Sequence, residues 1–203
     1  AAALAAGRTG ARVILADENA LFRGHILSTT ETIDSRHAKE WADIAVEELN
    51  SLPNITLLPR TTVFGYYDHN HLAALERVTD HMAIAPDNLP RQRLWTFRAK
   101  EVVLATGSVE RSMVFRDNDR PGTMLSGAAN AYLMQYGVKV GKRAVLFTSN
   151  DAAYRSALSL TEAGIDVSVL DTRPETAGPL PQEAIEKGID VRHEQAVVRT
   201  HGT

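Results

Sequence analysis

Two short stretches of this chain of 203 residues have the residue types that a dinucleotide ligand needs, and the first is acidic. Asp17 and Glu18 directly follow the apolar run at 13–16. In dinucleotide-binding folds, a carboxylate at the end of such a strand accepts hydrogen bonds from ribose hydroxyls. Such a carboxylate suits a ribose without a phosphate group, so the acidic residues favour NAD or FAD over NADP. A solvated acidic turn would have the same sequence, and both interpretations remain open.

The second stretch is Ala105-Thr106-Gly107, which follows the apolar run at 102–104. A predicted strand therefore ends on small residues that expose the backbone. Gly107 has no side chain and reaches backbone angles that are closed to other residues, so a flat or phosphorylated ligand can approach the main chain there. A sharp turn that needs only space would use the same residues, so these three alone do not identify a ligand site.

The elements that position these stretches form a β-α-β pattern in the first half of the chain. Alanine-rich residues 1–6 predict a helix, and 13–16 predict a β-branched strand. We expect the strand and glycine turn that precede this helix in a complete unit to lie upstream of Ala1. Asp34 is the predicted cap of a helix at 35–49. Strands are expected at 55–58, 61–67, 72–79, 94–97 and 101–104, with a polar hairpin turn at 67–71.

A second β-α-β pattern follows. Helices are predicted at 126–136 and 152–163, and strands at 144–147, 167–170, 189–192 and 195–200. The turn at 148–153 has other residues at all three positions of the glycine fingerprint, so side chains of Thr148 and Asn150 would crowd a pyrophosphate. Asp151 would repel it, and Asn150 or Asp151 makes a good helix cap instead. We therefore expect no phosphate site at this turn.

These patterns predict an α/β chain with a Rossmann-like fold, made of parts of two dinucleotide-binding domains with a β-hairpin insertion. The first domain is placed at 1–125, without its first strand and glycine loop. The second, degenerate and partial domain is placed at 126–203.

Composition narrows the class of function. The chain is 44% hydrophobic and 23% charged, with a net charge of -3 and no basic block, so we expect no nucleic-acid partner. Its apolar runs are far shorter than the ~20 residues of a membrane span. Cysteine is absent, which excludes thiol catalysis, opposes a flavin disulfide reductase and fits a cytoplasmic location. We find no catalytic motif, and His69 and His71 without a third ligand predict no metal site.

Four long strings carry a resemblance to a known family: LLPRTTVFGYYDHN, RQRLWTFRAKEVVLATGSVER, VFRDNDRPGTML and FTSNDAAYRSALSL. They resemble the alpha subunits of heterotetrameric sarcosine oxidases, and the resemblance covers essentially the whole chain. Those alpha subunits are much longer, and this chain looks like their amino-terminal to middle portion without the glycine-rich start and the folate-binding region.

The resemblance implies a function as part of a complex. Such complexes oxidatively demethylate sarcosine to glycine with O₂, giving hydrogen peroxide and a one-carbon folate product. It implies NAD in the alpha subunit, FAD and FMN in the assembled complex, and beta, gamma and delta subunits as partners. The NAD contacts implied by the resemblance are Asp17 and Glu18 at the ribose and the backbone of Thr62 and Val63 near the adenine. Ala105, Thr106 and Gly107 would line the far side of the cofactor. No catalytic residue of this chain is implied.

The chain departs from the family pattern at two points. Arg23-Gly24 stands where family members commonly have two glycines, and Arg23 either contacts a phosphate or is a solvated loop residue. Ser112 stands where the family often has proline. Without an upstream glycine turn, we expect the isolated chain to be inactive and to bind NAD weakly. Two alternatives remain: a non-catalytic interaction module with a degenerate dinucleotide fold, and a subunit of a related amine, opine or proline dehydrogenase.

Overall fold

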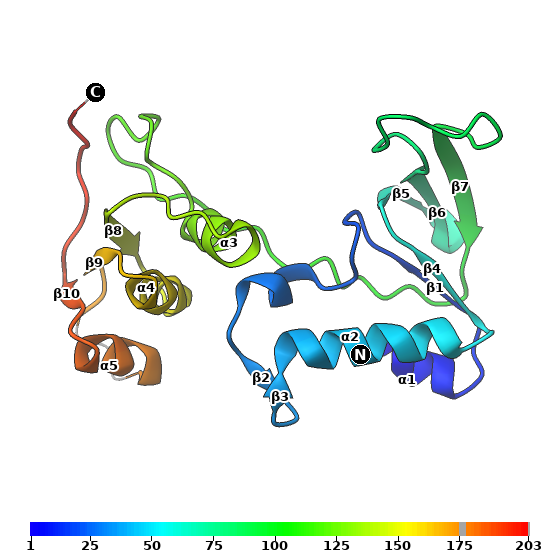
Figure 1. Cartoon of the computed structure of the whole chain (residues 1–203), viewed down its shortest axis with the longest axis horizontal. Coiled ribbons are helices and arrows are strands. Elements are labelled where there is room, and N and C mark those ends of the chain that lie inside the picture. The colour runs from blue at the N-terminus through cyan, green and yellow to red at the C-terminus, as the bar shows by residue number, and fades with distance from the viewer. Residues whose placement is uncertain (175–177, 203) are drawn as a thin grey trace. The chain divides into compact units, whose positions relative to one another are not determined.

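The computed structural model describes residues 1–174 and 178–202, and its contacts divide the chain into two compact units, Ala1–Thr106 and Gly107–Thr203. Figure 1 shows both as mixtures of helices and short strands. Among the described helices, none has both the length and the apolar character needed to cross a membrane.

The first unit begins with the predicted helix and strand. α1 (Ala2–Arg8) leads into β1 (Val13–Ala16), which pairs in parallel with β4 (Ile55–Leu58). α2 (Ala38–Ser51) connects them and packs with α1 around a small cluster of the buried residues Leu4, Ala45 and Leu49. A Cβ at Gly7 would come within 2.4 Å of Ile55 Cδ1, so glycine is what lets α1 approach β4 this closely.

The start of α2 differs from the prediction. Asp34 and Ser35 have φ values of 50° and 62° and form the turn of a small hairpin between β2 (Thr32–Ile33) and β3 (Arg36–His37). The helix therefore begins three residues later than predicted. Its cap is His37, whose Nδ1 accepts a hydrogen bond from the backbone N–H of Lys39. The predicted cap was wrong because the left-handed turn directs the Asp34 carboxylate to the indole N–H of Trp41 instead.

An antiparallel sheet in the order β5-β6-β7 confirms the predicted hairpin. β5 (Thr61–Tyr67) and β6 (His71–Arg77) are joined by the 3₁₀ turn η2 (Asp68–Asn70), and β7 (Gln92–Arg98) pairs with β6. Another 3₁₀ segment, η1 (Gly24–Ser28), follows β1. The hairpin sheet begins where β4 ends, which brings the start of β5 close to the end of β1.

The strand predicted at 101–104 does not form in this structure. Val103 and Leu104 are 70% and 68% exposed, and no strand pairs with this segment in the described part of the chain. An apolar run becomes a strand only when a neighbour satisfies its backbone groups, and a local sequence pattern does not specify that neighbour.

The second unit contains a parallel sheet in the order β10-β9-β8. Its elements are α3 (Ser126–Tyr136), β8 (Arg143–Thr148), α4 (Ala152–Glu162), β9 (Asp166–Asp171), α5 (Pro179–Glu186) and β10 (Asp190–His193). Its core comprises twelve buried residues: Ala129, Leu146, Ala153, Tyr154, Ala157, Leu158, Leu160, Ile165, Val167, Val169, Ala184 and Ile189. The strand predicted at 195–200 is reduced to an isolated bridge between Arg116 and Arg199, because no adjacent strand extends alongside it in the described part of the chain.

Residues 107–125 are grouped with the second unit by their contacts. The Glu110 carboxylate accepts hydrogen bonds from the backbone N–H groups of Ser126 and Gly127 at 3.0 and 2.7 Å, and so binds the start of α3. Further along, Arg199 donates to the Asp117 carboxylate at 2.7 Å. The contacts thus divide the chain after Thr106, whereas the division proposed from the sequence, after residue 125, stays a prediction.

Candidate functional site

The carboxyl end of β1 meets the start of β5 through backbone hydrogen bonds. The Asp17 N–H donates to the Leu58 carbonyl at 3.1 Å, which extends the parallel pairing of β1 and β4 by one residue. The Thr61 N–H donates to the Asp17 carbonyl at 2.8 Å. The structure therefore brings two predicted groups together, the acidic residues after β1 and the pair Thr62-Val63. This place is called the proximal edge below, and it comprises residues 17–19 and 60–63.

The two carboxylates of the proximal edge are only partly engaged. Asp17 Oδ1 accepts hydrogen bonds from the backbone N–H and the side-chain amide of Asn19 at 2.9 and 3.0 Å. Only the backbone carbonyl of Glu18 is bound, by the Arg77 guanidinium at 2.7 Å. Within the described part of the chain, no residue donates to Asp17 Oδ2 or to the Glu18 carboxylate. Acceptor oxygens thus remain for ligand hydroxyls.

Thr62 and Val63 offer both backbone and exposed side chains. They pair with Leu75 and Ala74 of β6, and no described strand lies on the other edge of β5. Both side chains are exposed. Unpaired backbone groups on an edge strand are free to bond the ring nitrogens and amino group of a purine, which is the role the resemblance implied.

Arg60 belongs to the proximal edge and was not among the residues predicted from the sequence. Its N–H donates to the Asn19 carbonyl at 2.8 Å, and its carbonyl accepts from the Arg77 N–H at 3.0 Å. Its φ is 52°, in the left-handed region that few residues with a Cβ adopt. Sequence reasoning missed this turn, because Pro59-Arg60 contains none of the glycine or asparagine that marks such turns.

Arg23 and Gly24 lie outside the proximal edge. The Arg23 guanidinium forms an ion pair with Asp43 of α2, and its side chain is 22% exposed. Gly24 begins η1 with a φ of 49°. The Arg23 side chain is therefore bound to α2 rather than solvated. Among the described residues, neither Arg23 nor Gly24 forms a hydrogen bond with Asp17 or Glu18.

Ala105, Thr106 and Gly107 lie where the chain passes from the first unit to the second. Gly107 has a φ of 70°, as expected for a residue chosen for its backbone freedom. All three are exposed. Among the described residues, no hydrogen bond joins Ala105 or Thr106 to the proximal edge, so their assignment to the same site stays a prediction.

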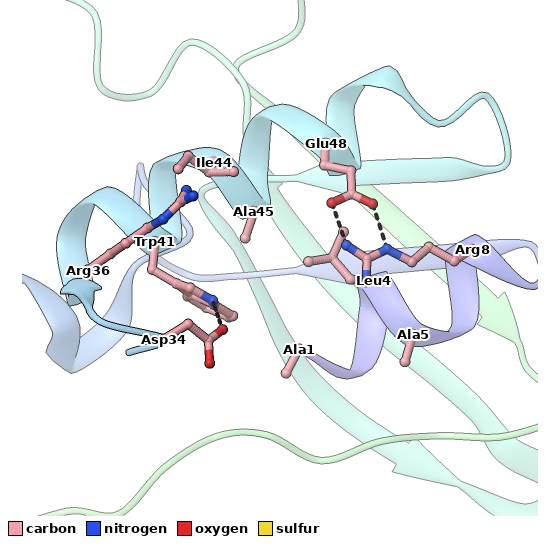
Figure 2. A pocket seen from close by; sticks show the side chains of 10 residues that line it. All are labelled: Ala1, Leu4, Ala5, Arg8, Asp34, Arg36, Trp41, Ile44, Ala45 and Glu48. Atoms are coloured by element: carbon pink, nitrogen blue, oxygen red, sulfur yellow. Dashed lines mark hydrogen bonds and ion pairs between the residues drawn. The ribbon is translucent and has the colours of Figure 1, made fainter. Parts of the chain in front are cut away.

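The first unit also contains a hollow of about 450 Å³ between α1, α2 and the β2–β3 hairpin (Figure 2). Trp41 forms one wall, with its indole bonded to Asp34, and the Arg8–Glu48 ion pair forms another. None of the residues predicted to bind a cofactor lines it. The hollow is therefore not part of the proximal edge.

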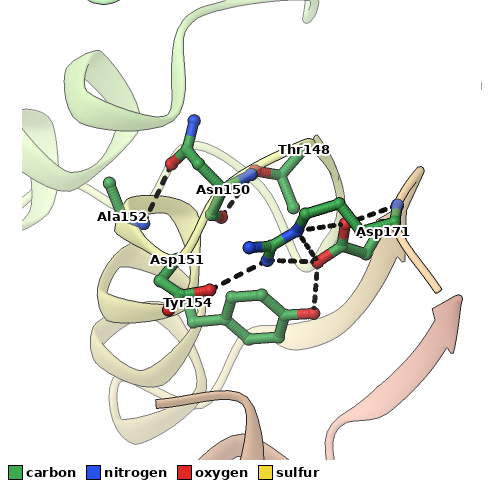
Figure 3. Close-up of polar contacts among 7 residues, drawn as sticks. Thr148, Asn150, Asp151, Ala152, Tyr154 and Asp171 are labelled. Carbon is green, nitrogen blue, oxygen red and sulfur yellow. Dashed lines mark hydrogen bonds and ion pairs between the residues drawn. The ribbon is translucent and has the colours of Figure 1, made fainter. Parts of the chain in front are cut away.

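A group of polar side chains lies at the carboxyl ends of the second unit's strands (Figure 3). We call it the distal edge, and it comprises Thr148, Asn150, Asp151, Tyr154, Asp171 and Arg173. Asp171 ends β9 and is fully buried. It accepts the Tyr154 hydroxyl at 2.9 Å and the Arg173 guanidinium at 2.6 Å. The same guanidinium donates to Asp151, at the start of α4, at 2.9 Å.

This network shifts the pKa values of its members. Burial alone would raise the pKa of Asp171, but hydrogen bonds from Arg173 and Tyr154 outweigh it, and the pKa lies below its usual value. Burial, and then the hydrogen bond to Asp171, raise the pKa of Tyr154. Asp171 is thus held as a carboxylate whose oxygens are occupied by the chain itself.

The turn before α4 satisfies its own donors. The Asn150 N–H donates to Thr148 Oγ1 at 3.1 Å, and the Ala152 N–H donates to Asn150 Oδ1 at 2.9 Å. The side-chain oxygen of Asn150, the residue before the N-cap position of α4 at Asp151, thus accepts from the first backbone N–H of the helix. Asp151 has no capping hydrogen bond of this kind, because its carboxylate faces Arg173.

Comparison with known proteins supports the resemblance drawn from the motifs. The chain is 46% identical over 98% of its length to the alpha chain of sarcosine oxidase from Rhizobium meliloti (strain 1021), and 43% identical over 98% to that of Corynebacterium sp. (strain P-1). It is 32% identical over 85% to one of the opine oxidase subunits of Agrobacterium tumefaciens (strain Ach5). The chain spans 19% and 21% of the two sarcosine oxidase chains and 34% of the opine oxidase chain. No family model matches it.

Solved structures of similar fold confirm the predicted fold class. Thioredoxin reductase from T. acidophilum superposes with a TM-score of 0.70 at 16% identity, covering 100% of this chain and 62% of that one. L-proline dehydrogenase from P. horikoshii gives a TM-score of 0.61 at 22% identity, covering 82% of this chain and 32% of that one. At these identities the likeness shows the fold alone.

Proposed function

We propose that this chain supplies the dinucleotide-binding part of the alpha subunit of a sarcosine oxidase, and that its proximal edge binds the adenosine half of NAD. Asp17 and Glu18 accept hydrogen bonds from the ribose hydroxyls, and the backbone of Thr62 and Val63 faces the adenine. Arg23, Gly24, Ala105, Thr106 and Gly107 are proposed as further contacts along the cofactor. The chain itself contributes no catalytic residue.

The proposal extends to the complex in which such a polypeptide functions. The sarcosine oxidase relatives are named as alpha subunits, which supports assembly with beta, gamma and delta subunits. There FAD and FMN would carry the oxidation of sarcosine to glycine by O₂, with hydrogen peroxide and a one-carbon folate as products, in the cytoplasm. Opine or proline oxidation by a related complex is the second candidate reaction, supported by the opine oxidase relative.

One observation carries the cofactor proposal: some carboxylate oxygens at the proximal edge have no donor among the described residues, whereas the Asp171 carboxylate at the distal edge is bound by side chains of the chain itself. Asp17 Oδ2 and the Glu18 carboxylate have no donor among the described residues, although both lie at the carboxyl end of a parallel pair. Ligands of open α/β sheets bind at this end of the strands. Free acceptors at that place suit ribose hydroxyls.

Titration of the ¹⁵N-labelled chain with NAD⁺ tests the proposal. We expect a dissociation constant above about 1 mM, near −4 kcal/mol, because no glycine-rich turn in this sequence offers backbone N–H groups to the pyrophosphate. Chemical-shift changes should centre on Asp17 and Thr62. Asp17→Asn should weaken binding about tenfold, since a hydrogen bond to a charged group contributes about 1.5–3 kcal/mol.

The matched control is Asp166→Asn, which removes an exposed carboxylate at the start of β9 and should leave the affinity unchanged. Shift changes centred on 148–151 would contradict the placement of the site. Submillimolar binding would contradict the account of the missing phosphate contacts, and the absence of any shift change at NAD⁺ concentrations about tenfold above that dissociation constant would overturn the proposal.

The distal edge supports an interaction role for the second unit. Its turn before α4 caps itself, and its buried carboxylate is bound by Tyr154 and Arg173. We therefore propose that the second unit binds no dinucleotide and serves to dock other subunits.

A further inference from the structure

Arg60 combines an unfavourable backbone with an unused side chain. A left-handed φ of 52° costs a residue with a Cβ free energy that glycine would not lose. The backbone is nevertheless held there from both sides, by the Asn19 carbonyl and by the Arg77 N–H. Strained residues of this kind gather at functional sites, where the surrounding structure imposes the conformation.

The Arg60 guanidinium is an exception among the partly buried arginines that the structure describes. Four arginines are partly buried in the structure: Arg23, Arg60, Arg120 and Arg173. The guanidinium groups of the other three are bound, to Asp43, to the Gly202 carbonyl and to the Asp151–Asp171 pair. That of Arg60 forms no hydrogen bond or ion pair with any residue in the described ranges. Arg60 is partly buried, and its guanidinium, which has no partner among the described residues, is available to a ligand.

The position of Arg60 in the chain and in space indicates which part of a ligand it would meet. It lies between the carboxylates proposed for the ribose, to which its backbone is joined through Asn19, and the Thr62-Val63 backbone proposed for the adenine. A guanidinium is planar and stacks on aromatic faces, whereas an ammonium does not. A second phosphate on the ribose would instead be repelled by Asp17 and Glu18.

We infer that Arg60 is a binding residue of the proximal edge and stacks on the adenine ring of the dinucleotide. This inference rests on the proposed function, since it needs an adenosine-containing ligand at that edge. The strained backbone then serves to present the guanidinium plane, which is why the side chain there is arginine although glycine would fit the backbone better.

The test combines binding with stability in three variants. Arg60→Gly should leave the unfolding equilibrium constant unchanged or lower it by up to about tenfold, because glycine relieves the left-handed strain while gaining freedom in the unfolded chain. It should weaken AMP binding, measured by NMR titration, by about tenfold, as for a base that loses its stacking partner. Arg60→Lys keeps the charge without the plane and should lose most of the same affinity. The control Arg12→Lys changes an exposed arginine at the other end of β1.

The outcomes separate this inference from the proposed function. AMP binding to Arg60→Gly equal to that of the unsubstituted chain overturns the stacking role and leaves the proposed function standing. A loss confined to 2′,5′-ADP, with AMP unaffected, also overturns it, because Arg60 would then bind the extra phosphate. Strong destabilisation by Arg60→Gly would show a structural role instead. No binding of AMP by the unsubstituted chain overturns both proposals.

Discussion

The proximal and distal edges occupy equivalent places in two similar β-α-β arrangements, but they differ in whether their charged groups are bound by other residues of the chain. At the distal edge Asp171 is buried, with donors from Tyr154 and Arg173 on its oxygens. At the proximal edge the Glu18 carboxylate and the Arg60 guanidinium have no partner within the described ranges. The two edges thus differ in whether side chains of the chain itself occupy the polar groups at the strand ends, and under the proposed function this difference identifies the proximal edge as the one that binds the ligand.

The two units also differ in the size of their buried apolar clusters. Among the described residues, the buried apolar cluster of the second unit has twelve members, whereas the α1–α2 cluster of the first has three. The other buried apolar residues of the first unit lie outside that cluster: Ala38, Ala42, Leu58, Leu72, Ala73 and Ala74. In the described part of the chain, the parallel sheet of the first unit has two strands, and that of the second unit has three. The second unit therefore has the larger contiguous apolar cluster in the described part of the chain. Ligand sites commonly belong to the less stable parts of a structure.

The largest effect is expected from Arg173→Met. It would leave the buried Asp171 carboxylate without its cation, and breaking a buried pair costs about 3–5 kcal/mol, a value we reduce to about 3 because the Arg173 side chain is 28% exposed. Hydrogen exchange of β8 and β9 amides in increasing urea measures the loss. Fluorescence of Trp41 and Trp95, both in the first unit, should show its unfolding unchanged.

The pH dependence of this variant sharpens the comparison. In the natural chain the pKa of Asp171 is lowered, so its stabilising effect is present above the unfolded pKa of about 3.9 and is lost as the pH falls through the lower folded value. Without Arg173, burial dominates and raises the pKa, so acidification should shrink the destabilisation. Asp171→Asn in the same background should restore part of the stability. Equal loss at mildly acidic and mildly alkaline pH would contradict this account of Asp171.

Tyr154→Phe should have the next largest effect, about 2 kcal/mol. The Tyr154 ring is fully buried, and its hydroxyl donates to a charged acceptor at 2.9 Å, a class of hydrogen bond that contributes about 1.5–3 kcal/mol. Urea denaturation followed by far-ultraviolet circular dichroism gives the value. Tyr136→Phe changes an exposed tyrosine of α3 and is the control. Equal effects of the two substitutions would contradict the importance of the buried network.

Hydrogen exchange of the unsubstituted chain compares the two units directly. We expect amides of β8 and β9 to be protected at least roughly tenfold more than those of β1 and β4, because the larger core must open before they exchange. Uniform strong protection from Val13 through Val169 in a dilute monomer would show that the small cluster of the first unit is sufficient for its stability.

The smallest effect is expected from Glu110→Ala, at about 1 kcal/mol, as for the loss of a helix cap. Its carboxylate binds the first N–H groups of α3 and the Ser126 hydroxyl. Gly127→Ala should have a smaller effect, because the added Cβ would come within 2.9 Å of Glu110 Oε2, the end of a flexible side chain that can shift, and alanine favours the helix. Faster exchange of the Ser126 and Gly127 amides checks both. Glu101→Ala, at an exposed glutamate in the first unit, is the control.

Local sequence patterns were sufficient to predict the fold class, most helices and strands, and the lack of a glycine fingerprint at 148–153. These features follow from apolar periodicity and from the presence or absence of particular residues, both of which are local properties. The same patterns predicted that β1 ends at the acidic pair Asp17-Glu18. They also predicted that the backbone at Gly107 uses the conformational freedom of glycine. They failed at 101–104 and 195–200, because an apolar run forms a strand only beside a neighbour that the local pattern does not supply.

Which charged groups are used and which are free depended on tertiary contacts. Asp17 follows β1 and Asp171 ends β9, so each is a carboxylate at the carboxyl end of an apolar strand. One oxygen of Asp17 is left unbound within the described part of the chain, whereas Asp171 is enclosed by Tyr154 and Arg173. The partners of a carboxylate lie on other elements, brought there by packing and by backbone conformations such as the left-handed turn at Arg60, so its availability to a ligand is a property of the folded chain.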